Sequence, residues 1–201
     1  MGRLLQRPAA GLSQIAAVTT GELAHGDHGV ARSDRVVLNP AAFDRLGDSG
    51  RRVVLAHEMT HVAVRSSTSA PVPIWLSEGF ADYVGYADVD LSRRAIAADV
   101  LALVRRGKGP HELPGTDDFD PTKTTIAPAY SGAWLACRLI AERYGERALV
   151  RLYRTAATTP VGERGPDPDA ALRAAFESVL GTSVARFTGA WRDDLRALAE
   201  Q

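Results

Sequence analysis

Hydrophobic and polar positions divide this chain of 201 residues into a short strand-like start and a long helical remainder. Short apolar runs over residues 14–20 and 35–38 predict strands, because each is bounded by turn-forming residues such as glycine or Asn-Pro. Residues 21–34 are rich in Gly, His and Asp, which predicts a loop or a hairpin turn. We therefore expect an N-terminal sheet of two or three strands.

The rest of the chain has the apolar spacing of helices. They are predicted over residues 50–65, 73–86, 91–106, 129–144, 146–157, 170–180 and 184–199. Residues 107–128 carry four prolines and predict a long irregular segment, and residues 160–168 predict a Pro- and Gly-rich linker. Gly181 is typical of the end of a helix, and Thr182 or Ser183 of the start of the next. Strands followed only by helices indicate an α+β fold with a dominant helical part.

We expect one compact unit with three parts. Residues 1–49 form the N-terminal strands and loops, residues 50–144 the helical core, and residues 145–201 the C-terminal helical part. The chain is long enough to bury a single core of this kind.

Three ionisable residues interrupt the helix predicted over residues 50–65. This helix is apolar nearly all round, which predicts a buried central helix, yet it carries His57, Glu58 and His61. One explanation is two histidines hydrogen-bonded within a core, but buried ionisable groups without partners each carry a desolvation penalty. A bound metal ion would offset that penalty.

The spacing of these three residues suits a zinc ion. His57 and His61 are four residues apart, so on a helix both imidazoles lie on one face and can reach the same ion. Glu58 lies about 100° further round the helix, where it can reach a water on the metal without being a ligand. In this His-Glu-x-x-His arrangement, Glu58 is the general base.

The helix predicted over residues 73–86 supplies a third ligand. A catalytic zinc ion needs three protein ligands and one open position. Glu78 follows His61 after a Pro-containing connector that is long enough for the chain to return antiparallel. Asp82, four residues after Glu78, lies on the same face and can accept a hydrogen bond from a zinc-bound histidine. We predict one zinc ion, bound by His57, His61 and Glu78.

The segments HEMTH and WLSEGFADY together resemble the gluzincin zinc metallopeptidases, the clan of thermolysin-like and aminopeptidase N-like enzymes, and especially small bacterial peptidase MA-like proteins. The resemblance covers roughly residues 14–144. It implies a zincin-type catalytic domain whose active-site helix spans residues 50–65, and it implies the same ligands and base, with Asp82 as the partner of His57. The implied activity is hydrolysis of a peptide or protein substrate.

A further segment, Ala129–Ala133 (AYSGA), is similar to the tyrosine-plus-glycine segment of the aminopeptidase N-like branch. That similarity implies that the Tyr130 hydroxyl stabilises the oxyanion. The early strand, QIAAVTTGE, departs from that branch because it lacks the Gly-x-Met-Glu-Asn stretch that recognises a free amino terminus, and Glu22 is the only nearby acid. An endopeptidase, or a hydrolase with a narrow partner, is therefore at least as well supported as an aminopeptidase.

Charge and cysteine content exclude several other classes. Lys plus Arg and Asp plus Glu both number 24, which argues against nucleic-acid binding because that requires a basic surface. Cys137 is the only cysteine, so neither an intrachain disulfide nor a cysteine-ligated zinc site can form. We expect Cys137, Trp134 and Trp191 to pack in the core. No apolar run approaches the about 20 residues of a membrane span, and the start is too short and interrupted for a signal peptide.

Two alternative functions stay open. One is a binding module that keeps the gluzincin scaffold and cleaves nothing. The other is a latent protease gated by a missing N-terminal region, because the abrupt start of the sequence suits the C-terminal part of a longer protein. We interpret His25 and His28 as exposed loop residues rather than a second metal site, and no local motif assigns a role to His111. The sequence carries no signal for compartment or oligomeric state.

Overall fold

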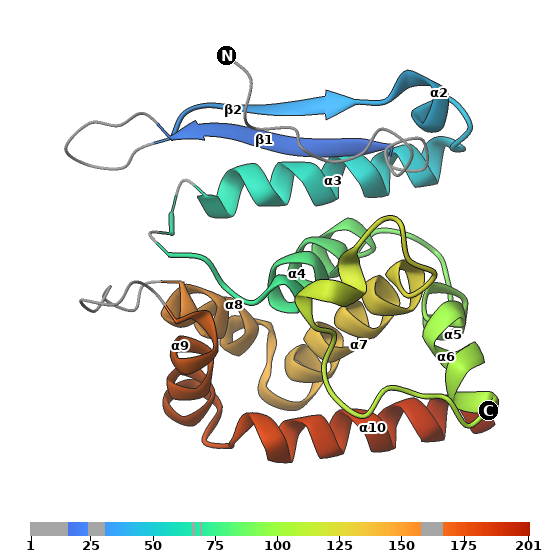
Figure 1. Ribbon diagram of the computed structural model, residues 1–201, viewed down its shortest axis with the longest axis vertical. Helices are drawn as coiled ribbons and strands as arrows, with labels where there is room; N and C mark the ends of the chain where they lie inside the picture. Colours follow the sequence, from blue (N-terminus) through green and yellow to red (C-terminus); the bar gives the residue numbers. More distant parts are fainter. Residues whose placement is uncertain (1–15, 24–30, 66, 69, 158–166) are drawn as a thin grey trace.

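The computed structural model describes residues 16–23, 31–65, 67–68, 70–157 and 167–201. This part of the chain is mostly helical, with one short antiparallel sheet near the N-terminus, in agreement with an α+β fold. Its elements are β1 (Ala17–Leu23), β2 (Ala31–Leu38), α2 (Pro40–Phe43), α3 (Asp48–Arg65), α4 (Ile74–Gly85), α5 (Arg93–Ile96), α6 (Ala98–Arg105), η1 (Thr116–Phe119), α7 (Ile126–Tyr144), α8 (Glu146–Ala156), α9 (Pro168–Ala175), η2 (Phe176–Leu180) and α10 (Val184–Glu200). Figure 1 shows the sheet, α2 and α3 as an upper layer above the helices from α4 to α10.

The described residues contain two strands, which pair antiparallel with Thr19 opposite Val36. β1 continues to Leu23 and β2 begins at Ala31, so the prediction of a loop over all of residues 21–34 is wrong at both ends. Backbone hydrogen bonds between the two strands extend the pairing past the apolar runs, and such pairing depends on context more than on residue type. The start of the first predicted strand lies outside the described residues.

Helix α3 lies between the sheet and α4. Val53 and Thr60 are buried, whereas Leu55 and Met59 are 40% and 56% exposed. The prediction of a helix buried all round is therefore wrong, because α3 has packing partners on two sides and the side that carries Leu55 and Met59 is open. At its end, Arg65 forms an ion pair with Asp34 of β2 at 2.7 Å, which fixes α3 to the sheet.

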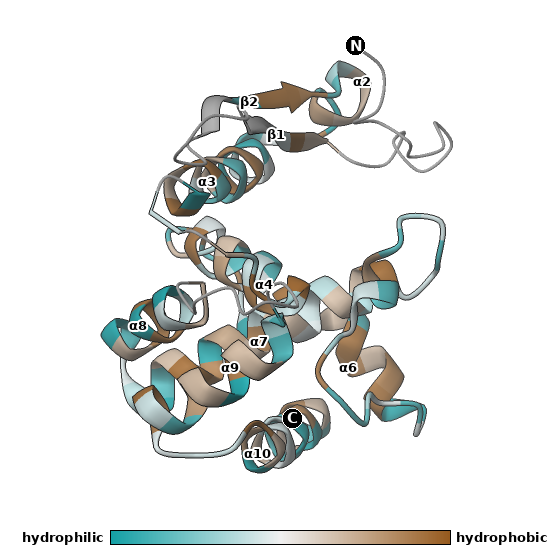
Figure 2. Ribbon diagram, turned by 60° about the vertical axis from the view of Figure 1, so that its left-hand side comes forward, coloured by the Kyte–Doolittle hydropathy of each residue, from teal (hydrophilic) through white to brown (hydrophobic). Residues whose placement is uncertain are grey.

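Helix α7 is the centre of the core. Its buried residues include Trp134 and Cys137, and Trp191 of α10 is fully buried against it, so the packing predicted for these three residues is confirmed. The indole N–H of Trp191 donates to the carbonyl oxygen of Gly132 at 3.2 Å. Helices α8, α9 and α10 are amphipathic and enclose the core, and their colour changes from hydrophilic to hydrophobic around each helix in Figure 2.

Two helix boundaries differ from the sequence-based prediction. One lies within the helix predicted over residues 91–106, and the other lies at the end of the irregular segment predicted over residues 107–128. The first helix is broken at Ala97 into α5 and α6, because the Ser131 hydroxyl on α7 accepts the hydrogen bond from the Val100 N–H at 3.2 Å. Helix α7 begins at Ile126 rather than at residue 129. Pro128 is tolerated there because the N–H groups of a first helical turn need no intrahelical partner.

Gly79 allows α4 to approach α7 closely. A Cβ atom at this position would collide with the carbonyl oxygen of Ala133 and lie 3.0 Å from Cys137 Sγ. We expect Gly79→Ala to lower the free energy of unfolding by about 1–3 kcal/mol, the usual cost of overpacking. Gly189→Ala on α10 is the control, since that Cβ would meet nothing within 4 Å and alanine favours helix. Urea unfolding measures the free energy of unfolding of both variants. Equal changes in the two variants would contradict the prediction for Gly79.

Candidate metal site

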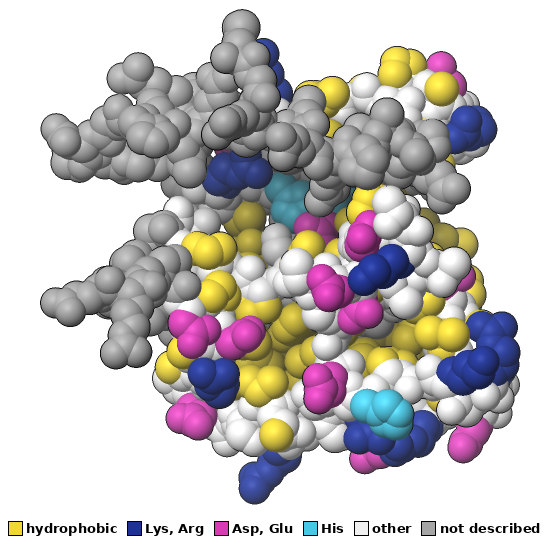
Figure 3. Space-filling model, in the orientation of Figure 1, with side chains coloured by type: hydrophobic (Ala, Val, Ile, Leu, Met, Phe, Trp, Pro, Cys, Tyr) yellow, Lys and Arg dark blue, Asp and Glu magenta, His cyan; other side chains and the backbone are white. Residues whose placement is uncertain are grey.

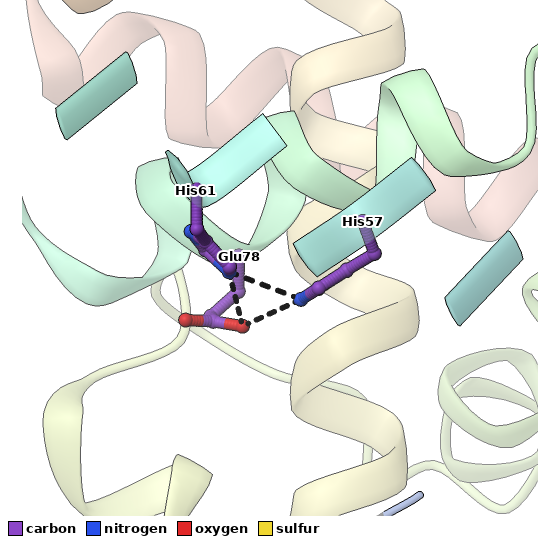
Figure 4. Close-up of side chains that lie close together, drawn as sticks. All are labelled: His57, His61 and Glu78. Atoms are coloured by element: carbon purple, nitrogen blue, oxygen red, sulfur yellow. Dashed lines mark hydrogen bonds and ion pairs between the residues drawn. The ribbon is translucent and has the colours of Figure 1, made fainter. Parts of the chain in front are cut away.

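The predicted ligands come from two adjacent helices. His57 and His61 lie one turn apart on α3, and Glu78 projects toward them from α4 (Figure 4). The ligand atoms of the three residues lie within 4.8 Å of one another, so this cluster could hold a metal ion.

The three side chains point to a common centre. The Nε2 atoms of His57 and His61 are 3.1 Å apart, and Glu78 Oε2 lies 3.3 Å from the first and 3.6 Å from the second. A tetrahedral ion with ligand bonds of about 2.0–2.1 Å holds its ligand atoms about 3.3 Å from each other. The observed triangle therefore fits a small four-coordinate ion without rearrangement of the helices.

Asp82 orients the first histidine. It lies one turn after Glu78 on α4, and its Oδ1 is 2.7 Å from His57 Nδ1. The Nδ1–H of His57 donates to this buried carboxyl oxygen, which leaves Nε2 directed at the centre of the cluster. The pairing of Asp82 with His57 is the one that the resemblance implied.

The cluster has strongly coupled charges. Burial disfavours the charged form of His57, but hydrogen bonds to Asp82 and Glu78 outweigh it and raise the pKa of His57 to about 10. Burial also disfavours ionised Glu78, whose pKa is nevertheless lowered to about 2 by hydrogen bonds from His57 and His61. Burial raises the pKa of Asp82, and its bond with His57 partly offsets this effect. A proton on His57 thus competes with any cation at this centre.

That competition predicts a pH dependence of metal binding. With a pKa near 10, His57 is protonated at pH 7 and must lose the Nε2 proton to become a ligand, whereas Glu78 is already ionised. We expect metal-free protein to release about one proton from His57 per ion bound at pH 7–8, and the apparent affinity to rise by up to about tenfold per pH unit in this window. Calorimetric titration in buffers of different ionisation enthalpy counts the protons.

The control for this titration is Asp82→Asn, which removes the main group that stabilises the charge on His57. It should release a smaller fraction of a proton at the same pH. A wild-type binding enthalpy that is independent of the buffer would contradict the prediction.

Glu58 lies next to the cluster and is held by the sheet. Its side chain is buried, and the Thr19 hydroxyl on β1 lies 2.7 Å from its Oε2 and 3.0 Å from its carbonyl oxygen. The sequence did not single out Thr19. The available signal was a polar residue in a mostly apolar strand, on the same side as buried Ala17.

A cavity of about 390 Å³ opens beside the cluster, and we call it the metal-side cavity. Its wall includes His57, Glu58, Asp82, Asp99, Tyr130 and Trp134. The ring of Tyr130 is centred 6.3 Å from that of His57, so this predicted residue lies in the same cavity as the predicted base. Figure 3 shows a recess between the upper layer and the helical part, with histidine and acidic side chains visible inside it.

The remaining histidines are not part of the described cluster. His111 lines a different cavity, of about 450 Å³, together with Arg192 and Arg196 of α10. The irregular segment around it does reach the metal-side cavity, but through Pro121. His25 and His28 lie outside the described residues.

No protein-family model, curated protein or solved structure matches this chain. Within the described part of the chain, none of the helices combines the length and apolarity required to cross a membrane.

Proposed function

We propose that the protein is a zinc-dependent metallopeptidase with a zincin-type catalytic domain of the gluzincin kind. The observation that carries this proposal is the convergence of His57, His61 and Glu78 on one point, with the Glu58 carboxylate beside it in the wall of a cavity. A buried histidine pair serving only the core would not require a third ligand and an adjacent carboxylate facing an open space.

The donor set supports zinc. Two imidazole nitrogens and one carboxylate oxygen suit this ion, and three protein ligands are typical of catalytic rather than structural zinc sites. When bound, zinc supplies a Lewis acid that polarises a carbonyl oxygen and brings the pKa of coordinated water to about 7. The hydrogen bond from His57 to Asp82 keeps the ligand nitrogen of His57 facing the ion.

Glu58 moves the proton in the proposed reaction. Its carboxylate accepts a proton from the attacking water as the oxygen adds to the peptide carbonyl carbon. It then donates that proton to the leaving amine nitrogen as the carbon–nitrogen bond breaks, which gives a carboxylic acid and an amine; transfer of the acid proton to the amine then gives a carboxylate and an ammonium. The Thr19 hydroxyl holds Glu58 in place during both transfers.

Tyr130 stabilises the carbonyl oxygen in this proposal. Its side chain lies in the same cavity as Glu58 and is positioned by Phe119, whose ring centroid is 5.1 Å from its own. A hydroxyl that donates to the oxygen as it gains negative charge lowers the barrier to attack.

The direct test combines elemental analysis with peptide cleavage. We expect one zinc ion per chain and cleavage of a mixed peptide library that stops with a chelator and returns with added zinc. Bound zinc with no cleavage by this chain or by a longer form would instead support the binding module. Cleavage by only one of the two forms would reveal gating. Absence of zinc would overturn the proposal.

A further inference from the structure

The metal-side cavity has features that bear on the substrate. It is about 390 Å³ in volume, which is within the range of small-ligand sites and large enough for one amino-acid side chain. It begins at His57 and Glu58 and extends past Tyr130 to the first turn of α6. A group bound in it would therefore lie beside the proposed reacting bond.

The charges that line this cavity favour a cation. Glu58, Asp82 and Asp99 line it together with His57, which gives up its Nε2 proton when zinc is bound, and no lysine or arginine is among its described lining residues. Glu58 accepts a hydrogen bond from Thr19, and Asp82 is bound to His57. Asp99 forms no hydrogen bond or ion pair with another described residue through its carboxylate, so it is available to a ligand.

Asp99 is held at the wall by the break between α5 and α6. The Ser131 hydroxyl accepts the Val100 N–H at 3.2 Å, which ties the start of α6 to α7 next to Tyr130. The Asp99 carboxylate therefore belongs to the same cavity as Glu58, although the two residues are distant in the sequence.

Aromatic rings form another part of the wall. Tyr86, Tyr130 and Trp134 line the cavity, and the rings of Tyr86 and Trp134 meet edge to face with centroids 6.0 Å apart. Asp99 lines the same cavity as this aromatic pair. Aromatic faces together with a carboxylate are a favourable environment for guanidinium and ammonium groups.

We propose that the metal-side cavity binds a cationic group of the substrate next to the bond that is cleaved, and that Asp99 determines this preference. The cation is the side chain of Arg or Lys or a terminal ammonium, which share the same chemistry. The inference rests on the proposed function for the cleavage step, but cation binding is measurable without turnover.

The binding test uses zinc-loaded protein and three probes. N-acetyl-arginine amide carries only the side-chain cation, citrulline amide only the terminal ammonium, and N-acetyl-citrulline amide neither. We expect at least one cationic probe to bind roughly two- to fivefold more tightly than the neutral probe, as for an exposed charge pair. In NMR titrations, Asp99→Asn should abolish this difference in affinity. The cationic probe whose advantage disappears shows whether the site binds the side-chain cation or the terminal ammonium.

Asp169→Asn is the matched control, because Asp169 also lies in the first turn of an eight-residue helix and is remote from the cavity. It should retain the preference. Equal binding of all three probes, or a preference that survives Asp99→Asn, would overturn the inference.

Cleavage separates this inference from the proposed function. Peptides matched except for Arg or citrulline, with free or acetylated ends, should differ in kcat/KM in wild type and converge in Asp99→Asn. Cleavage without any such preference overturns the role of Asp99 and leaves the peptidase standing. Binding that depends on Asp99 without cleavage of any peptide overturns the peptidase and retains the cation site.

Discussion

Glu58→Gln is expected to lower kcat/KM for peptide cleavage by about 10³-fold, within the range lost when a general base is removed. The amide has the shape of the carboxylate and its oxygen can still accept the Thr19 hydrogen bond. It cannot, however, take a proton from water. Since Glu58 is not among the three converging ligands, zinc content should remain at one ion per chain.

Turnover and elemental analysis of the same preparations check both halves of this prediction. Glu177→Gln is the control, because Glu177 is exposed on η2, far from the cluster in the chain and in the fold. Cleavage by Glu58→Gln at the wild-type rate would show that another group moves the proton. Loss of zinc from the variant would show that Glu58 is a ligand.

His61→Ala is expected to weaken zinc binding by at least about 100-fold, because one of three protein ligands is lost from a site worth several kcal/mol per ligand. Zinc that binds only the folded protein adds about 2.7 kcal/mol to the free energy of unfolding at 100 times its Kd. At the same zinc concentration, zinc should add less than about 0.5 kcal/mol to the free energy of unfolding of the variant. Activity should fall with metal content.

Thermal or urea unfolding with and without zinc measures that difference, and it separates loss of the ion from any effect of the substitution itself. His111→Ala is the matched control, since His111 lines a separate cavity. It should keep the full zinc-dependent gain. Stoichiometric zinc in His61→Ala would remove this residue from the ligand set.

Local geometry explains why the cluster of His57, His61 and Glu78 was predictable from the sequence. The four-residue spacing of His57 and His61 determines a shared face once a helix is assumed, and the same holds for Glu78 and Asp82. The turn residues between the two helices predict an antiparallel return. The bonds from His57 to Asp82 and Glu78 follow from these two periodicities and one connector.

The hydrogen bond from Thr19 to Glu58 was not predictable in this way. Thr19 reaches Glu58 across 39 positions of sequence, through pairing between a strand and a helix that no local pattern specifies. Asp99 reaches the cavity just after the break between α5 and α6, where the Val100 N–H donates to the Ser131 hydroxyl on α7. Both contacts are tertiary, and so is the open side of α3 that leaves Met59 exposed. Periodicity describes which residues share a face, but it does not specify what covers that face.

The hydrogen bond from Thr19 links the position of the Glu58 carboxylate to the packing of β1 on α3. In the proposed function the ion is held by side chains of α3 and α4 alone, whereas the described contact that aligns Glu58 requires β1 to pack on α3. Metal binding and alignment of the proposed base therefore depend on different parts of the fold. A substitution that loosens β1 from α3 is expected to leave the three candidate ligands in place while Glu58 loses its hydrogen bond from Thr19.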